Sequence, residues 1–410
     1  MTPRILVTGT GAVSALGSSA QSNWEAVIAG RSGIGPRVFD PGPHGPPPVT
    51  LPAAIPEDGF ESALEARCGR KLSATLDRFS LMALAAAFEA LDAAGLMGSP
   101  TLETRTAVVL GHGQGGQQSM DKGYERFYGL KTQRMHPASV PKIMVSGAVS
   151  AVAMQFGIHG PVFATSSACA SSAHAVIQGA SLIQSGLADV AIVGGSEAIA
   201  TPGSMAGWMA IQALASDTCR PFSAGRSGMV MAEGAAALIL ESWEHAQARG
   251  AVAGGEYLGG GMSSDAFHIT QPSLDGASAA LGAAVRIART HDGGPVLVSA
   301  HGTGTALNDA NEAAAIRRVF GDEWREQAVI ATKSAHGHLI GGSSALQAVL
   351  AIRAINEGLA PPVLNYLGPD PDCEVELVLQ TAREIRARTT VVNAFAFGGL
   401  NATMAFGRAP

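Results

Sequence analysis

The 410-residue sequence has few charged residues (15%) and few aromatic ones (5%), while 47% of its residues are hydrophobic. A chain with so little charge and so much apolar material is expected to bury a large core, and its length is ample for one. The formal net charge is −6 and no long basic run occurs. The composition therefore lacks the electrostatic footprint of a nucleic-acid-binding protein.

Cysteine and long hydrophobic runs are also scarce. The four cysteines are Cys68, Cys169, Cys219 and Cys373, and no two of them form a CxxC pair. This spacing suggests neither a zinc knuckle nor a disulfide framework and fits a reducing compartment. The longest apolar run, Ile143 to Ile158, contains serine, glycine and glutamine and is short for a membrane span. Because the chain enters a predicted strand at Ile5 with no signal-peptide layout, we expect a cytoplasmic protein without a membrane segment.

Glycine is plentiful, with 51 residues scattered through apolar segments, which indicates close packing and many tight turns. After the predicted strand Ile5 to Thr8, the glycines from Gly9 to Gly17 predict a tight turn that enters a helix. The segment 36–56 holds eight of the 22 prolines and is predicted to be a surface loop.

Predicted strands and helices alternate through both halves of the chain, which favours sheets covered by helices. Helices are predicted at 81–94, 146–156, from the turn after Cys169 to about 185, 277–288, 308–319 and 343–355. One strand is predicted at 107–110 and another in a segment that ends near 165. Further strands are predicted at 189–193, 234–240, 256–258, 296–299, 329–332, 375–379, 390–393 and 402–406.

Two of these helices, after Cys169 and after Gly341, occupy matching places in the two halves. Both are rich in Ala, Ser and Gly, as a helix between two sheets requires. We therefore predict a duplicated α/β unit with a shared middle helix layer, with one half at 1–250 and the other at 251–410.

The stretch from Phe163 to His174 joins a buried strand to a helix through a turn of small residues that carries Cys169. A cysteine at a helix N-terminus lies where the macrodipole and unpaired N–H groups favour the thiolate. The same N–H groups can hold a developing oxyanion. Free cysteine is, however, among the most buried residue types, so on these residues alone a nucleophile and a structural cysteine are about equally good interpretations.

Three further loops follow predicted strands, where reactive groups converge in sheet-based folds. They are His301-Gly-Thr-Gly-Thr305, Lys333-Ser-Ala-His-Gly-His338 and Ala394-Phe-Ala-Phe-Gly-Gly399. A single histidine or lysine in a loop is more often a surface residue, but three such loops beside a cysteine turn favour a reactive site. The glycines near 9 and 111 match a dinucleotide-binding fingerprint only weakly, so a nicotinamide oxidoreductase is the least favoured class.

Four motifs in order resemble those of the β-ketoacyl-acyl-carrier-protein synthases, the decarboxylating condensing enzymes of the thiolase superfamily. The motifs are Ser167-Ala-Cys169-Ala-Ser, His301-Gly-Thr-Gly-Thr, Lys333-Ser with Gly337-His338, and Phe397-Gly-Gly-Leu-Asn401. The resemblance covers essentially the whole chain. It implies an α/β fold of the thiolase-like type, five-layered αβαβα, with duplicated half-domains around a shared central helix layer.

The resemblance also implies residue roles. Cys169 would carry the acyl chain as a thioester, while His301 and His338, as neutral N–H donors, would stabilise the enolate formed from malonyl-carrier protein. The backbone N–H groups of Cys169 and Phe397 would form the oxyanion hole. Lys333 and Glu312 would form an ion pair that fixes the charge and geometry around the histidines.

The substrate site would also follow the family, with a phosphopantetheine arm held by Thr303 and Thr305 and by a lining that includes Phe395, Phe397 and Gln114. No metal and no cofactor are expected beyond the phosphopantetheine of the carrier. Candidate carrier-docking cations are Arg70, Lys71, Lys131 and Arg134, although Ala74 and Thr75 stand where a basic pair is often found.

The sequence departs from the family pattern at Gln114, in the small residues of 137–141, at Ala396 and at Leu400. They favour a roomier and more polar acyl pocket; the alternative is that Gln114 swings aside. The pathway therefore stays open between fatty-acid and type II polyketide or polyene elongation.

Two rivals remain within this superfamily. A non-catalytic chain-length partner of a ketosynthase heterodimer would usually lack the cysteine. A thiolase or coenzyme A-dependent initiating synthase would not carry the two-histidine pattern. Carrier protein is the expected partner, a homodimer packed through strands next to the cysteine turn is favoured, and a heterodimer with a chain-length factor is the other arrangement.

Overall fold

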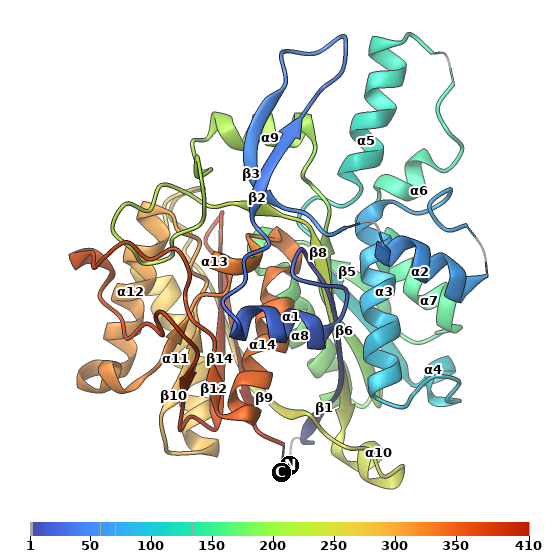
Figure 1. Cartoon of the computed structure of the whole chain (residues 1–410). Coiled ribbons are helices and arrows are strands. Elements are labelled where there is room, and N and C mark those ends of the chain that lie inside the picture. The colour runs from blue at the N-terminus through green and yellow to red at the C-terminus, as the bar shows by residue number, and fades with distance from the viewer. Residues whose placement is uncertain (1–2, 58, 70, 133, 410) are drawn as a thin grey trace.

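One continuous array of ten strands organises the molecule (Figure 1). The computed structural model describes residues 3–57, 59–69, 71–132 and 134–409. The first half contributes, from the edge inward, β5 (Val162–Thr165), β4 (Thr106–Gly111), β6 (Val190–Glu197), β8 (Gly234–Ser242) and β1 (Ile5–Val13). The second half contributes β11 (Val329–Ile330), β10 (Val296–Ser299), β14 (Thr389–Ala396), β15 (Leu400–Gly407) and β9 (Gly255–Ser264).

The two halves have the same topology. In each half, the strand that comes first in the chain lies at the inner edge and pairs antiparallel with the strand that comes last. The last strand pairs antiparallel with its other neighbour, and the two outer pairs are parallel. The halves meet where Ile5–Val7 of β1 pair with residues 255–257 of β9. The predicted duplication of an α/β unit is thus visible in the strand order itself.

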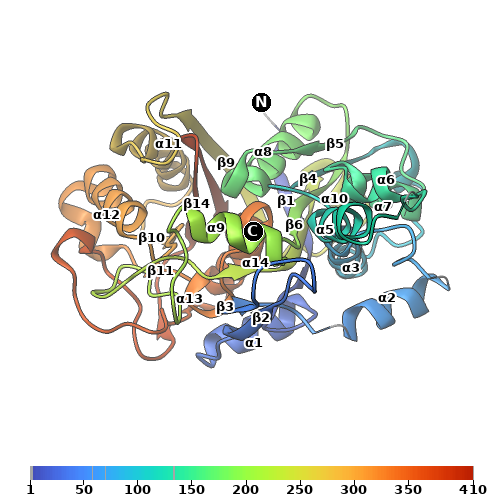
Figure 2. The same ribbon diagram turned by 90° about the horizontal axis from the view of Figure 1, so that it is seen from above.

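Helices fill the middle and cover the outside. The central helices α8 (Ser171–Gln184) and α14 (Ser343–Glu357) pack on each other and on strands of both halves, as Figure 2 shows from above. The Oγ atoms of Ser172 and Ser344 lie 2.7 Å apart across this layer. On the outer faces, α3 (Arg78–Ala93) packs on β1 and β8, and α11 (Leu274–His291) packs on β9 and β15 with α12 (Ala306–Phe320) beside it. This arrangement confirms the five-layer prediction.

The remaining helices are shorter. They are α1 (Ala20–Ile28), α2 (Gly59–Cys68), α4 (Thr101–Thr104), α5 (Gln117–Tyr124), α6 (Ser139–Ile143), α7 (Gly147–Phe156), α9 (Pro202–Ala210), α10 (Trp243–Ala248) and α13 (Lys333–His336). Single turns lie at Glu125–Gly129, Ala168–Ala170, Gly321–Glu326, Ile340–Gly342 and Pro371–Cys373. Two short strands, β12 (Leu359–Ala360) and β13 (Arg383–Glu384), pair with each other. Among the described helices, none has the length and apolarity needed to cross a membrane.

The turn predicted after Thr8 begins later than expected, because β1 continues through Gly9 and Gly11 to Val13; the turn lies at 14–17, and α1 follows it. A Cβ on Gly9 would lie 2.1 Å from the carbonyl oxygen of Ala90, and one on Gly11 would lie 2.1 Å from that of Ala86. The glycines therefore let α3 approach the strand closely.

The proline-rich segment also differs from its prediction. It forms a hairpin of β2 (Gly35–Phe39) and β3 (Val49–Ala54), with β7 (Met231–Ala232) as the third strand of a small separate sheet. Pro36 lies opposite Pro52 in the register. Prolines are tolerated here because these strands are short and lie outside the main sheet. The strand predicted at 375–379 is reduced to isolated bridges.

Candidate active site

The turn that carries Cys169 is held in a strained conformation. Ala168, just before the cysteine, has a φ of +50°, and Cys169 lies in the single turn that leads into α8. The hydroxyl of Ser171 accepts the backbone N–H of Ser167 at 2.9 Å and donates to the carbonyl of Ala168 at 2.7 Å. A non-glycine residue with positive φ persists only where its surroundings hold it, so these bonds fix the position of the sulfur.

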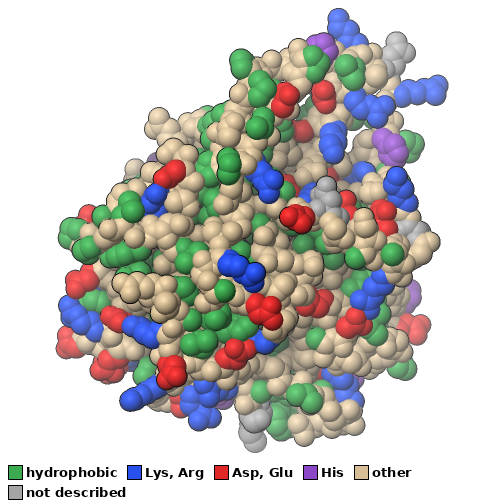
Figure 3. Space-filling view, in the orientation of Figure 1, with side chains coloured by type: hydrophobic (Ala, Val, Ile, Leu, Met, Phe, Trp, Pro, Cys, Tyr) green, Lys and Arg blue, Asp and Glu red, His purple; other side chains and the backbone are tan. Residues whose placement is uncertain are grey.

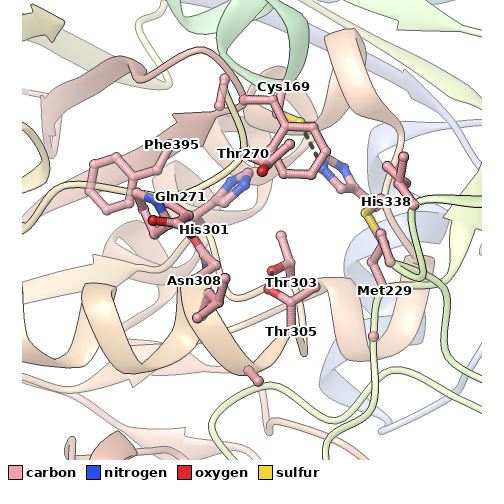
Figure 4. A pocket seen from close by; sticks show the side chains of 18 of the residues that line it. Cys169, Met229, Thr270, Gln271, His301, Thr303, Thr305, Asn308, His338 and Phe395 are labelled. Atoms are coloured by element: carbon pink, nitrogen blue, oxygen red, sulfur yellow. Dashed lines mark hydrogen bonds between the residues drawn. The ribbon is translucent and has the colours of Figure 1, made fainter. Parts of the chain in front are cut away.

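Cys169 opens into a cavity of about 490 Å³ that is lined mostly by the second half of the chain (Figure 4). Most of the residues predicted to line the site do so: His301, Thr303, Thr305, His338, Phe395 and Phe397. The hydroxyls of Thr303 and Thr305 lie 2.9 Å apart on one wall. The cavity therefore connects the nucleophile candidate with both histidines and both threonines.

The sulfur and the two imidazole rings form one compact group. The Nε2 atom of His338 lies 3.1 Å from the Sγ atom of Cys169. The sulfur and one nitrogen of each ring all lie within 4.8 Å of one another. The ring centroids of His301 and His338 are 5.4 Å apart, with the planes at 84°. Residues from opposite halves of the chain are thus brought together, as the four motifs predicted.

The hydrogen bonds of His338 determine which of its nitrogens carries the proton. The Nδ1 atom lies 3.1 Å from the backbone N–H of Ile340, which can only donate, and 2.8 Å from the hydroxyl of Ser343. Since Nδ1 is an acceptor, the proton of the neutral ring is on Nε2. His338 therefore presents an N–H donor to the cavity beside Cys169.

His301 is held in the same tautomer by Lys333. The Nζ atom of Lys333 lies 3.4 Å from Nδ1 of His301 and donates to the carbonyl of His301 at 2.6 Å and to Oε1 of Gln347 at 2.7 Å. The ammonium group faces the lone pair of Nδ1, which leaves the proton on Nε2. Gln347 is fixed in turn by a bond from its Nε2 to the carbonyl of Ala300.

Burial and the lysine charge keep both rings neutral. Desolvation, with the nearby Lys333 charge as the next cause, holds the pKa of His301 and of His338 well below the ordinary value. Burial also lowers the pKa of Lys333, while the nearby acidic groups oppose this shift. The site therefore contains two uncharged N–H donors beside a buried cation.

The thiol differs from the sequence-based expectation of a thiolate. Burial raises the pKa of Cys169 to about 12, although Lys333 and the backbone N–H groups of Cys169 and Phe397 act to lower it. The resting group is consequently the thiol, because desolvation outweighs the local positive potential. The same two backbone N–H groups therefore lie beside the thiol, where the thioester carbonyl would be attacked.

Glu312 lies beneath the His301 loop but does not form the predicted ion pair with Lys333. Its carboxylate accepts the backbone N–H groups of His301 at 2.7 Å and Gly302 at 2.8 Å, and the side-chain amide of Asn393 at 2.9 Å. With its oxygens occupied by these donors, Glu312 fixes the backbone of the loop, and the ammonium bonds elsewhere. The two charges interact only across a distance.

The sulfur and two ring nitrogens also form a possible metal-ligand set among the described residues. A ligating histidine must offer a lone pair to the ion. In His338 the Nδ1 lone pair already accepts from the peptide N–H of Ile340, so Nε2 bears the proton. The tautomer thus suits hydrogen-bond donation better than metal binding.

Comparison with known proteins agrees with this geometry. Residues 2–246 match the family model of the β-ketoacyl synthase N-terminal domain, and residues 255–367 match that of the β-ketoacyl synthase C-terminal domain. The chain belongs to the β-ketoacyl synthase family.

Relatives within the family match over nearly their whole length. Nodulation protein E of Rhizobium meliloti (strain 1021) is 40% identical over 408 residues, covering 99% of each chain. The 3-oxoacyl-[acyl-carrier-protein] synthase 2 of Coxiella burnetii (strain RSA 493 / Nine Mile phase I) is 33% identical over 414 residues, covering 99% of this chain and 98% of the relative.

Solved ketosynthases have the same thiolase-like fold. The ishigamide ketosynthase/chain length factor structure superposes with a TM-score of 0.92 at 31% identity, over 100% of both chains. A type II polyketide ketosynthase solved with its acyl-carrier protein, AntDE:AntF, gives a TM-score of 0.84 at 26% identity, also over 100% of both chains.

The predicted pocket residue Gln114 and the predicted carrier-docking residues that the structure describes do not line the cavity. Gln114 does not line the cavity; its exposed side chain lies 3.5 Å from the hydroxyl of Ser204 on α9. Of the docking candidates, Lys71, Lys131 and Arg134 are exposed, while Arg70 lies outside the described residues. Figure 3 shows Lys and Arg side chains gathered at the upper right, over the region of α5 and α6.

Several supporting residues of this ketosynthase site were missed by the sequence analysis. Gln347, Asn393 and Ser343 are fully or almost fully buried and hold the lysine, the glutamate and a histidine respectively. A long polar side chain inside an Ala-rich helix, as at Gln347, was the available signal. Such a residue is costly to bury unless it has hydrogen-bond partners.

Proposed function

We propose that this protein catalyses a decarboxylative Claisen condensation. A Cys169-bound acyl chain would be joined to malonyl-acyl-carrier protein to give β-ketoacyl-acyl-carrier protein, in fatty-acid or type II polyketide or polyene elongation. In this proposal residues 1–250 supply the nucleophile, and residues 251–410 supply both histidines and Lys333. The observation that carries it is the buried thiol within 4.8 Å of two imidazole nitrogens whose tautomers make them donors.

Acylation is the first step. The thiol of Cys169 attacks the thioester carbonyl of the acyl-carrier, and its proton is transferred to the departing phosphopantetheine sulfur. The developing oxyanion on the thioester carbonyl is held by the backbone N–H groups of Cys169 and Phe397, both of which act on the resting thiol to lower its pKa. A sulfur nucleophile is suited to this role because the thioester it forms is itself readily displaced.

Decarboxylation follows when malonyl-carrier enters the cavity, with Thr303 and Thr305 as partners for its phosphopantetheine arm. The bond between the methylene carbon and the carboxylate breaks, carbon dioxide leaves, and the electron pair forms an enolate whose oxygen faces Nε2 of His301 and His338. Neutral donors stabilise this oxygen without giving up a proton, so the enolate carbon remains nucleophilic. Burial strengthens both hydrogen bonds.

Carbon–carbon bond formation completes the reaction. The enolate carbon attacks the carbonyl of acyl-Cys169, and the tetrahedral oxyanion is held by the same backbone N–H groups. Collapse of this intermediate expels the Cys169 sulfur as a thiolate, which takes up a proton from water and returns to the thiol that burial favours.

A non-catalytic chain-length partner subunit is the alternative function. Neighbouring structures described as a ketosynthase with its chain-length factor make this class relevant. Here the cysteine, both histidines and the lysine are all present, with Lys333 beside His301 and His338 beside Cys169, which supports the catalytic role.

The expected partner of the enzyme is an acyl-carrier protein, as in the solved AntDE:AntF complex. Lys122 and Arg126 are exposed on the same segment as the docking candidates Lys131 and Arg134. Such a cationic surface suits an acidic carrier. A homodimer packed through β5, the edge strand next to the Cys169 turn, is the favoured assembly, and a heterodimer with a chain-length factor is the other.

Mass spectrometry after mixing with acyl-carrier protein tests the proposal. We expect the acyl group on the peptide that bears Cys169, and we expect Cys169→Ala to abolish acylation and condensation while malonyl decarboxylation persists. An unmodified peptide together with unchanged elongation by the variant would refute the assignment.

A further inference from the structure

Glu197 is a buried carboxylate at the end of β6 whose oxygens accept four backbone N–H groups. Its Oε2 atom lies 2.6 Å from the nitrogen of Gly113 and 3.1 Å from that of Gly341. Its Oε1 atom lies 3.2 Å from the nitrogen of Gln114 and 3.3 Å from that of Gly115. The donors belong to two segments that are far apart in the sequence, so one side chain joins them.

The first segment, 111–116, begins at the last residue of β4 and lies beside the cysteine turn. The hydroxyl of Ser171 is 3.3 Å from the carbonyl of His112. At Gly111 a Cβ would lie 2.2 Å from the carbonyl carbon of Ser171, so the strand end touches the start of α8. Movement of this segment would therefore change the surroundings of the acyl group on Cys169.

The second segment, 338–342, holds His338. The backbone N–H of Ile340 fixes the His338 tautomer, yet Ile340 itself has a φ of +41°, which is strained for a β-branched residue. Such a conformation must be maintained by its surroundings. The bond from the N–H of Gly341 to Glu197 is one of the interactions that maintain it.

The two segments are also in direct contact. A Cβ on Gly113 would lie 2.6 Å from Cγ2 of Ile340 and 2.8 Å from Oε2 of Glu197, and one on Gly341 would lie 2.5 Å from the nitrogen of Gly113. The backbones thus lie too close for side chains, and the carboxylate is their common acceptor.

We propose that Glu197 is a positioning residue that couples the 113–115 loop, beside the acylated cysteine, to the turn that holds His338. Acyl-chain acceptance and malonyl decarboxylation would then depend on one carboxylate. This inference rests on the proposed function and adds a link between its two half-reactions.

A carboxylate is suited to this role because it only accepts hydrogen bonds and offers about four lone-pair sites. Burial raises the pKa of Glu197 to about 7, and its four N–H partners oppose that shift. A glutamine at this position would turn an amide group toward two of the four N–H donors in either orientation. Loss of this one acceptor oxygen leaves two backbone N–H groups without their partner, and this is costly where such a group is buried.

The test compares Glu197→Gln with the wild-type protein in three measurements: hydrogen exchange followed by mass spectrometry, malonyl decarboxylation, and acylation of Cys169 by a panel of acyl-carriers. We expect faster exchange in both peptides, 111–116 and 338–342. We also expect decarboxylation to fall about tenfold and the acyl-chain preference to change. If Glu197→Gln does not fold, Glu197→Asp keeps the charge but is too short to reach all four donors.

The matched control is Glu241→Gln, which neutralises another buried carboxylate at the far end of β8, opposite Val190 in the register. We expect Glu241→Gln to show wild-type rates of hydrogen exchange in both peptides and a wild-type rate of decarboxylation. Faster exchange in only one peptide, or wild-type decarboxylation by Glu197→Gln, would overturn the coupling. A wild-type protein that does not decarboxylate malonyl-carrier would instead refute the proposed function, and the exchange measurement would still test the link.

Discussion

Replacement of His338 by alanine isolates one of the two N–H donors that we propose stabilise the enolate. Its Nε2–H is directed into the cavity by two bonds to Nδ1, and the donor is buried, so water does not substitute for it in the intact site. Loss of one oxyanion-hole donor typically costs about 100- to 1000-fold in rate, or roughly 3 kcal/mol. We expect a loss of this size in malonyl decarboxylation, because His301 would remain as the single imidazole donor.

The assay uses a Cys169→Ala background, in which decarboxylation proceeds without condensation. Conversion of malonyl-carrier to acetyl-carrier is followed by the intact mass of the carrier. Ser343→Ala is the control: Nδ1 of His338 keeps the N–H of Ile340, so the tautomer is preserved and the loss should be about fivefold or less. Decarboxylation by His338→Ala within about tenfold of the parent would show that the enolate is stabilised elsewhere.

Three further results are expected. Charge reversal at Lys71 and Arg134 should raise the KM for carrier protein about tenfold at low salt and less at high salt; an unchanged KM would exclude this docking surface. Since burial lowers the pKa of Lys333, its ammonium is present below that lowered pKa and is lost as pH rises through it. The rate of decarboxylation should therefore fall as the pH rises through this pKa. If the rate of Lys333→Met falls over the same pH range, the role of the lysine is contradicted. Gly9→Ala should destabilise the fold by about 2 kcal/mol or more, because the added methyl group meets the carbonyl of Ala90; an unchanged urea midpoint would contradict that packing.

Local pattern predicted much of the fold correctly. The apolar and Ala-rich periodicity near α3, α8 and α14 located these helices to within a few residues at most ends. The duplicated order of strands and helices predicted the shared central layer. Local rules failed at Gly9 and in the proline-rich hairpin, where contact with α3 and a position outside the main sheet decided the outcome.

The four motifs alone predicted the β-ketoacyl synthase family, because they contain the cysteine and both histidines in a recognisable order. Which nitrogen of each histidine bears its proton was decided only by the tertiary structure, through Ile340 and Lys333. The same is true of the protonated thiol and of Glu312, whose partners are backbone groups. Hydrogen-bond direction and desolvation depend on atoms brought together from distant parts of the chain, and no local pattern of residues encodes them.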